Sequence, residues 1–343
     1  MSAYVSIMTA LGWSLLASFW QMALLWAACY LLTTGNKRFS AAGKHNLILL
    51  FIVFGFEWFM YTFFHLLKEP AGATATGLLP VSAAFSEWIP FISSMYLLIL
   101  SVRFMHYIFQ FHKQQDLKYL MPVTPSIQSF TDRFTRILGI TKRVVVLQSE
   151  KTRTAETSGF FKPVILLPLS LLTRLSPAQV ETILVHELFH IRRNDYLINI
   201  IATAFRSIFF FNPFAQLFYK SLERERELAC DDGVLELGYD PSVYAEALFS
   251  LEKYRQANPG FSLAVDGKKP WLLMERIRRV LGKPALKENG FSPMILFGFA
   301  TAFLFFGIQL MALPDRRASA AVQESVVPVH YELAEEKPIP AFS

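Results

Sequence analysis

The segment His186-Glu187-Leu188-Phe189-His190 carries the residues whose types and spacing are best suited to chemistry. Two histidines four residues apart project from the same face of a helix, so both imidazoles can bind one zinc ion. Glu187 would then lie beside a metal-bound water. Because zinc lowers the pKa of that water towards neutrality and a carboxylate can take its proton, the segment predicts hydrolysis of a peptide bond with Glu187 as the general base.

The residues around this motif favour a metal site over a chance match. The helix is apolar almost all round, through Ile183, Leu184, Val185, Leu188, Phe189 and Ile191. Such a helix should be buried. Because unpaired polar groups are costly to remove from water, two histidines and a glutamate on a buried helix need a partner, and a metal ion supplies one.

A catalytic zinc usually takes three protein ligands and leaves one position open, so a third ligand is needed. After Asn212-Pro213 the sequence predicts a helix over 214–237 that ends at Gly238. Glu227 and Asp231 lie one turn apart on it. This spacing lets Glu227 bind the metal while Asp231 accepts the free ring N–H of a ligand histidine. The preceding Glu223-Arg224-Glu225-Arg226 is interpreted as a solvated helix face.

Two neighbouring residues remain open to other roles. The Cys230 thiolate is able in principle to bind zinc, but we interpret Cys230 as a small buried residue. Tyr244 is one conceivable donor to the oxyanion of the tetrahedral intermediate, although the sequence does not identify that group.

The elements that must position these residues belong to a membrane protein. Of the 343 residues, 53% are hydrophobic, and the mean hydropathy is +0.35. Four segments, at about 5–33, 46–67, 88–111 and 290–313, are near or above the roughly 20 residues that a bilayer requires. The first lacks the basic start and cleavage site of a signal peptide, so we expect it to remain as an anchor.

Basic residues predict the orientation of these spans. Lys37, Arg38 and Lys44 lie between the first two spans, whereas the loop before the third is nearly free of lysine and arginine. Short loops rich in such residues favour the cytoplasm. We therefore expect three transmembrane helices within 1–111, a cytoplasmic metalloprotease domain at 112–289, a fourth span at 290–313 and a short extracytoplasmic tail at 314–343. Arg316 and Arg317 oppose this orientation but are outnumbered.

Charge and cysteine content limit the partners. The net charge of +6 is accounted for by membrane topology, because no basic stripe with interleaved aromatic residues predicts nucleic-acid binding. Only Cys29 and Cys230 are present, which gives no disulfide framework and indicates a reduced compartment for the catalytic region.

The cytoplasmic segment is predicted to combine helices with strands at 144–149 and 164–167. Pro163 and Pro168 flank the second strand and favour an edge position, where it either binds an extended peptide substrate or is an ordinary edge. The apolar run at 197–211 is short for a span and contains Arg206. It predicts a buried or interfacial helix that sets the site at the membrane surface.

An ordered set of motifs resembles the BlaR/MecR-type antirepressor membrane metallopeptidases across nearly the whole chain. The motifs are Phe161-Lys162-Pro163-Val164-Ile165-Leu166-Leu167-Pro168, the segment from His186 to Asp195, Phe211-Asn212-Pro213, and Glu227-Leu228-Ala229-Cys230-Asp231. The resemblance implies a mainly α membrane protein with four transmembrane helices and a cytoplasmic α+β gluzincin-like zinc metalloprotease domain. It implies His186, His190 and Glu227 as Zn²⁺ ligands, Glu187 as base and Asp231 as the partner of a ligand histidine.

The family also implies partners and a role. Its members transmit an external signal by cleaving, or triggering cleavage of, a winged-helix transcriptional repressor, often with cleavage of their own chain. We therefore expect a protein substrate of that kind, contact with membrane lipid, no direct nucleic-acid contact, and a bacterial inner (cell) membrane location. A homodimer is also compatible with this assignment. The basic stretch 276–283 is the candidate for self-cleavage.

This chain departs from the sensor members of the family at its carboxyl end. Those members carry a penicillin-binding domain after the fourth span, whereas only 314–343 follows here, so we do not expect β-lactam sensing through such a domain. Two other functions stay open. One is a membrane-protein quality-control zinc protease, and the other is a non-catalytic signalling scaffold stabilised by zinc.

Overall fold

Three long helices near the amino terminus form the most apolar part of the structure. The computed structural model describes residues 3–34, 39–68, 83–114, 120–149, 152, 154–257, 270–283 and 298. Helices α1 (Ala3–Thr34), α2 (Ala41–Lys68) and α3 (Ala83–Gln114) cover the first three predicted spans. Each contains a stretch of 23 to 30 residues that is long and apolar enough to cross a membrane. The predicted fourth span lies outside the described residues apart from Gly298, and the tail at 314–343 lies outside them entirely.

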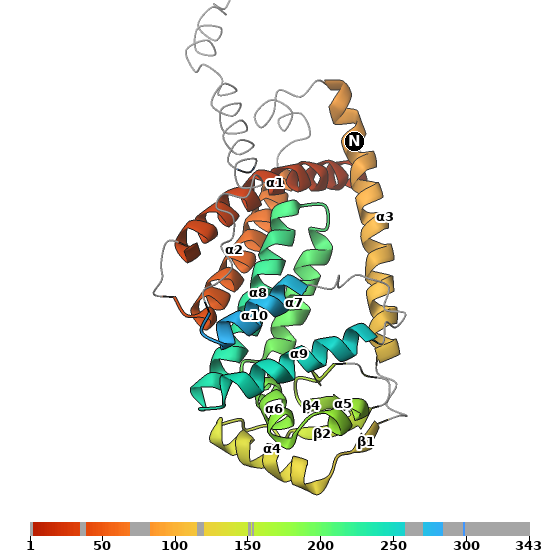
Figure 1. Cartoon of the computed structure of the whole chain (residues 1–343). Helices are drawn as coiled ribbons and strands as arrows, with labels where there is room; N and C mark the ends of the chain where they lie inside the picture. Colours follow the sequence, from red (N-terminus) through yellow and green to blue (C-terminus); the bar gives the residue numbers. More distant parts are fainter. Residues whose placement is uncertain are drawn as a thin grey trace, which may run out of the picture.

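A small sheet and several helices follow α3, as the sequence predicts. The strands lie across the sheet in the order β1 (Leu120–Pro122), β2 (Val145–Ser149), β4 (Val164–Pro168) and β3 (Glu156–Ser158). Strands β2 and β4 are parallel, and the two outer strands pair antiparallel to them. Helices α4 (Pro125–Ile137) and α5 (Leu169–Arg174) lie beside this sheet (Figure 1).

The predicted edge position of the second strand is wrong. Strand β4 pairs with β2 on one side and with β3 on the other, so it lies inside the sheet. Its prolines do not prevent this, because Pro163 precedes the strand and Pro168 is its last residue. Neither proline removes a backbone donor from the middle of the ladder. Among the described strands, β3 occupies the edge that the sequence analysis assigned to β4.

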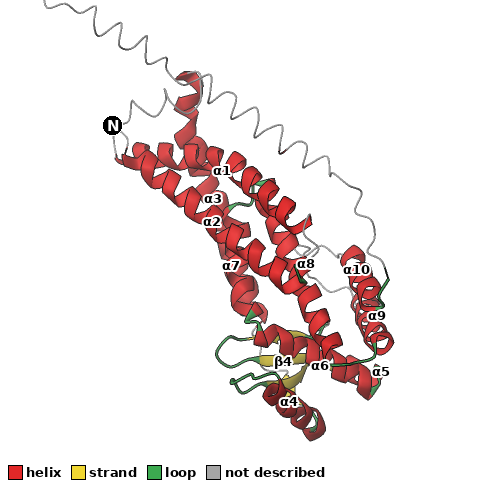
Figure 2. Ribbon diagram, turned by 90° about the vertical axis from the view of Figure 1, so that its left-hand side faces the viewer, coloured by secondary structure: helices red, strands yellow, loops and turns green. Residues whose placement is uncertain are grey.

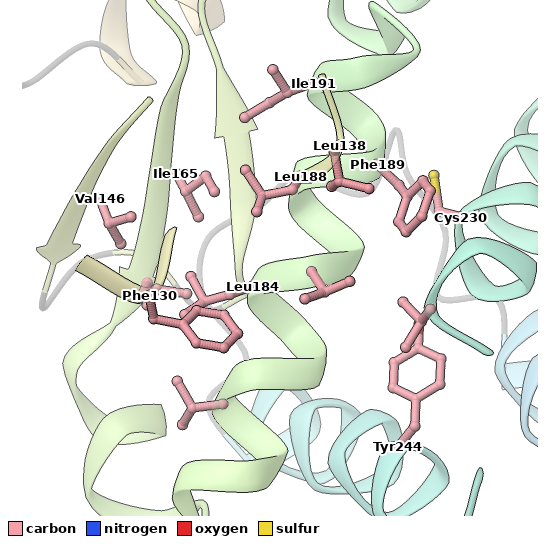
Figure 3. Close-up of a cluster of buried hydrophobic side chains, with 14 of the residues drawn as sticks. Phe130, Leu138, Val146, Ile165, Leu184, Leu188, Phe189, Ile191, Cys230 and Tyr244 are labelled. Carbon is pink, nitrogen blue, oxygen red and sulfur yellow. The ribbon is translucent and has the colours of Figure 1, made fainter. Parts of the chain in front are cut away.

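Helix α6 (Pro177–Arg192) covers the sheet and forms the centre of the hydrophobic core that follows the three long helices in sequence. Its start is fixed by a capping box, in which Ser176 and Gln179 exchange side-chain to backbone hydrogen bonds. Figure 3 shows Leu188 turned towards Ile165 of β4, while Phe189 faces the opposite side, where Cys230 lies. Because α6 is covered on both sides, its polar residues are enclosed, as the sequence predicts.

Helices α7 (Asp195–Ile208) and α8 (Pro213–Glu236) form a hairpin that packs along the three long helices (Figures 1 and 2). At its turn, Asn212 caps α8 by accepting hydrogen bonds from two backbone N–H groups and donates to the Ser18 carbonyl at 3.0 Å. The Tyr96 hydroxyl donates to the Ile208 carbonyl at 3.1 Å. Ser18 lies near the middle of α1, so the turn reaches the middle of the candidate spans. The buried or interfacial helix predicted over 197–211 is confirmed as a helix up to Ile208, with Ala202 and Phe205 buried and with Leu197, Ile200 and Ile201 exposed.

Two further helices close the structure around α6 and α8. Helix α9 (Pro241–Ala257) packs against α6, and α10 (Pro270–Val280) packs against α8 and α9 (Figure 1). The sheet, α6, α8, α9 and α10 therefore surround one region of the molecule, and the predicted site residues lie there.

Candidate metal centre

Three side chains from two helices converge as predicted. His186 and His190 lie on α6, Glu227 lies on α8, and one potential ligand atom from each falls within 4.8 Å of the others. Nε2 of His186 is 3.7 Å from Oε2 of Glu227, and Nε2 of His190 is 3.9 Å from Oε1 of the same carboxylate. Zinc bonds of about 2.1 Å in tetrahedral geometry place donor atoms roughly 3.4 Å apart. The two histidine to glutamate distances therefore lie within a few tenths of an ångström of those in a zinc site.

His190 is oriented by an aspartate that the sequence analysis did not assign. Nδ1 of His190 lies 2.8 Å from Oδ2 of Asp195, which is buried at the start of α7. Asn194, in the left-handed region with φ 56°, makes the sharp turn from α6 that brings Asp195 back to the ring. The contact leaves Nε2 of His190 to face Glu227. The signal in the sequence was an acidic residue directly after the helix that carries both histidines.

His186 is oriented by Asp231 together with Tyr244 of α9. The Tyr244 hydroxyl lies 2.8 Å from Nδ1 of His186 and donates to Oδ1 of Asp231 at 2.6 Å. Oδ1 of Asp231 is itself 3.3 Å from that ring nitrogen. Asp231 therefore lies where the sequence analysis expected it. The Tyr244 hydroxyl is committed to these two partners, which removes the reason to assign it to the oxyanion.

The charges of these groups suit a cation site. Burial would lower the pKa of His186, but its contacts with Asp231 and Glu227 outweigh burial and raise that pKa to about 9. Burial would raise the pKa of Glu227, yet His186 and Arg276 hold it well below its usual range. The pKa of Asp231 is lowered in the same way by Arg276 and His186, against the effect of burial. Both carboxylates are thus anionic at neutral pH, and a metal that binds His186 must displace a proton from it.

Glu187 borders the same cavity as the three converging side chains. The cavity has a volume of about 450 Å³ and includes His186, Glu187, His190 and Glu227 in its wall. Oε2 of Glu187 accepts a hydrogen bond from the Thr157 hydroxyl of β3 at 2.7 Å. The Glu187 carboxylate is therefore held beside the potential ligands by a side chain of the edge strand.

The remaining wall of the cavity is partly peptide-like and partly apolar. Residues Thr154 to Thr157, which include the start of β3, form one side. The apolar side chains come from α6, α9 and α10, and they are Ile183, Leu248, Leu251 and Leu273. This cavity is large enough for several side chains of a bound peptide.

Cys230 lies behind the site. Its Sγ is 3.4 Å from Nδ1 of His190 and 3.7 Å from Asp195, on the far side of the ring from Glu227. Burial raises the pKa of the Cys230 thiol well above its usual range. The thiol is thus kept protonated, in agreement with its interpretation as a small buried residue.

Arg276 of α10 is the second group that the sequence analysis left unassigned at this site. Its guanidinium makes two hydrogen bonds to Asp231, each 2.8 Å long, and Nη1 lies 3.2 Å from Oε2 of Glu227. From the sequence, the stretch 276–283 is predicted only as a candidate cleavage segment. No short-range spacing links Arg276 to the histidine motif, because the two are 90 residues apart.

Comparisons with known proteins agree with this arrangement. The family model described as BlaR1 peptidase M56 matches residues 80–280, more than half of the chain. Over 95 residues the chain is 30% identical to the "Regulatory protein BlaR1" of Bacillus licheniformis, covering 28% of this chain and 16% of that protein. Over 96 residues it is 27% identical to the "Methicillin resistance mecR1 protein" of Staphylococcus aureus, with the same coverage. The aligned region covers about a sixth of the length of these relatives. The family model covers all the helices and strands that surround the site. The chain belongs to the BlaR1 peptidase M56 family, whose members are metallopeptidases.

Proposed function

We propose that this chain is an integral membrane zinc endopeptidase in which His186, His190 and Glu227 bind the metal and Glu187 is the general base. The observation that carries the proposal is the convergence of these four side chains on one cavity. Two histidines and a carboxylate are a donor set that catalytic zinc uses. Zinc held there would supply Lewis acidity that polarises the peptide carbonyl and acidifies the attacking water.

The chain's own residues perform the proton transfers. The Glu187 carboxylate, fixed by Thr157, takes a proton from the attacking water and returns it to the leaving amine. Asp195 and Asp231 keep each histidine ring turned so that Nε2 faces the cavity. The guanidinium of Arg276 contacts both Glu227 and Asp231.

The edge strand supports binding of an extended peptide. Strand β3 forms one wall of the cavity and carries the Thr157 hydroxyl that holds Glu187. An extended substrate that pairs with this edge would run past the base, with side chains directed into the apolar wall. We therefore assign the binding of an extended peptide to β3, and not to the 164–167 strand for which the sequence predicted it.

The hairpin of α7 and α8 supports a site at the membrane surface. Its turn contacts the middle of α1, and Glu227 follows Pro213 by 14 residues of helix, or about 21 Å. That distance exceeds half of a hydrocarbon core of about 30 Å. The site would therefore lie just beyond the bilayer, on the cytoplasmic side if the basic residues set the orientation as expected.

The relatives support a role in signalling. The names of the two relatives describe a regulatory protein and a methicillin resistance protein. We infer that this chain, in a bacterial inner membrane, relays a signal by cleaving a protein substrate, with a winged-helix repressor as the expected target. Self-cleavage within 276–283 would require α10 to unwind first, because residues up to Val280 are helical and proteases bind extended backbone.

Mass spectrometry of cells that express the wild-type chain or Glu187→Gln tests the proposal. Peptides cut only with the wild type identify the substrate, and we expect the Glu187→Gln chain to retain its metal and produce none of them. Glu181→Gln is the matched control, since it makes the same change on α6 away from the cavity. Unchanged cleavage in Glu187→Gln would refute the role of the base. A metal-loaded wild type that cuts nothing under any stimulus would favour the scaffold, and misfolded membrane proteins as targets would favour quality control.

A further inference from the structure

The guanidinium of Arg276 touches three members of the metal site at once. Nε and Nη2 donate to the two oxygens of Asp231 at 2.8 Å each, and Nη1 lies 3.2 Å from Oε2 of Glu227. Nη2 is also 3.4 Å from Nε2 of His186. The Arg276 side chain is only 13% exposed, so these contacts are largely shielded from water.

The two carboxylates need such a partner. Glu227 and Asp231 are one turn apart on α8 and both lie against the ring of His186. As two anions in a largely enclosed site they repel each other, and a cation that contacts both offsets that repulsion. A guanidinium is planar and has several fixed donors, so one arginine can bind both carboxylates and also set the angle between them.

We propose that Arg276 is a positioning residue that holds the Glu227 and Asp231 carboxylates in the arrangement required for metal binding. The inference rests on the proposed metal site and adds α10 to the helices α6, α7, α8 and α9 that already contribute to it. Helix α10 carries none of the proposed metal ligands. Under this proposal the affinity for the metal nevertheless depends on how α10 packs against α8.

Other contacts already attach α10 to α8, so Arg276 is not needed merely to hold the helix in place. Glu275 accepts hydrogen bonds from Arg224, including one from Nε at 2.9 Å. Arg279 donates to Asp232 at 3.0 and 2.6 Å. These two ion pairs flank Arg276 along the helix and do not contact His186, His190 or Glu227. Arg276, between these two ion pairs, is the residue whose side chain contacts the proposed ligands Glu227 and His186.

The chain offers a matched pair of substitutions. Arg276→Gln removes the charge and the fork at the site, whereas Arg279→Gln makes the same change one turn further along α10, at a pair that is 43% and 29% exposed. Arg276→Lys keeps the charge but has no planar fork, so it tests whether geometry or charge is required.

The experiment measures metal binding by the purified 343-residue chain in detergent. The metal-free protein is titrated with Co²⁺, whose visible absorption reports ligand geometry, and Zn²⁺ affinity is then measured by competition. We expect Arg276→Gln to weaken binding by about 10- to 100-fold and to change the Co²⁺ spectrum, as for other partners of metal ligands. Arg279→Gln should match the wild type, and Arg276→Lys should recover part of the affinity.

The outcomes separate this inference from the proposed function. If the wild type binds neither Co²⁺ nor Zn²⁺, the metallopeptidase proposal fails and this inference fails with it. If the wild type binds and Arg276→Gln shows the same affinity and spectrum, only the role of Arg276 is overturned. Should Arg276→Gln not fold, Arg276→Lys decides the matter, because a spectrum and affinity identical to the wild type would contradict a role for the fork.

Discussion

Asp195 and His190 are joined by a 2.8 Å contact from the carboxylate to Nδ1, on the opposite side of the ring from Glu227. His186 has the equivalent relationship with Asp231 at 3.3 Å. Each histidine of the motif thus has its own aspartate, one from α7 and one from α8. This pairing determines which ring nitrogen is directed at the cavity, and under the proposed function it makes both aspartates partners of the metal ligands.

Asp195→Asn is therefore expected to weaken metal binding. The asparagine amide has the same shape as the carboxylate but carries no negative charge, so it is a weaker hydrogen-bond acceptor for the N–H of the His190 ring. We therefore expect the affinity for the metal to fall by about 10- to 100-fold. Competition with a chromophoric chelator measures it. Asp132→Asn, on the exposed face of α4, is the control and should bind as the wild type does. Equal affinity in both variants would remove Asp195 from the centre.

Thr157→Val should slow cleavage without removing the metal. The substitution keeps the shape of the side chain but deletes the hydroxyl that donates to Glu187 at 2.7 Å. Loss of one such hydrogen bond is worth about 1 kcal/mol, or roughly 5-fold in rate. Initial rates of substrate cleavage and metal content are measured together. A variant that loses its metal would show that Thr157 supports the fold of the site and not the base.

Asn212→Ala is expected to destabilise the chain. Asn212 is fully buried, caps α8 through Phe214 and Ala215, and donates to Ser18 of α1. Removing the cap and leaving a buried carbonyl without its donor should cost about 1–3 kcal/mol. Thermal unfolding in detergent reports this loss as a lower midpoint. Thr124→Ala is the comparison, because the Thr124 side chain makes no capping bond to α4 and should leave the midpoint nearly unchanged.

Gly233→Ala tests the close approach of α8 to α6. A Cβ at Gly233 would lie 2.5 Å from the ring of Phe189, the residue that precedes His190. The methyl group must push the buried ring aside, at a cost of about 1–3 kcal/mol. The double variant with Phe189→Leu provides the space, so its unfolding free energy should be higher than the sum of the single effects predicts. Strict additivity would contradict the clash.

The sequence is most informative where the arrangement of side chains depends on spacing within one helix. His186 and His190 share a face of α6, and Glu227 and Asp231 share a face of α8, because residues four apart in a helix are neighbours. Asp195 was within reach of the same reasoning, since it immediately follows the turn at Asn194. What was missing was a reason for the chain to fold back onto His190, and the left-handed Asn194 supplies it.

The other contributions depend on how helices dock, which spacing does not reveal. Tyr244 is 58 residues from His186, and Arg276 is 45 residues from Asp231. The position of β4 inside the sheet was missed because prolines at the ends of a strand limit its own hydrogen bonds but do not determine its neighbours. Likewise, the apolar run of α7 predicted a buried or interfacial helix, yet only the contact between Asn212 and Ser18, 194 residues apart, shows which helix the hairpin packs against.

Metal analysis of the purified wild type and of Glu227→Gln tests the central claim most directly. After dialysis against zinc and removal of excess ion, we expect about one zinc per wild-type chain. Glu236→Gln, an exposed change at the end of the same helix, should retain it, whereas Glu227→Gln should lose most of it. Undiminished, equally tight zinc in Glu227→Gln would contradict a centre built from His186, His190 and Glu227.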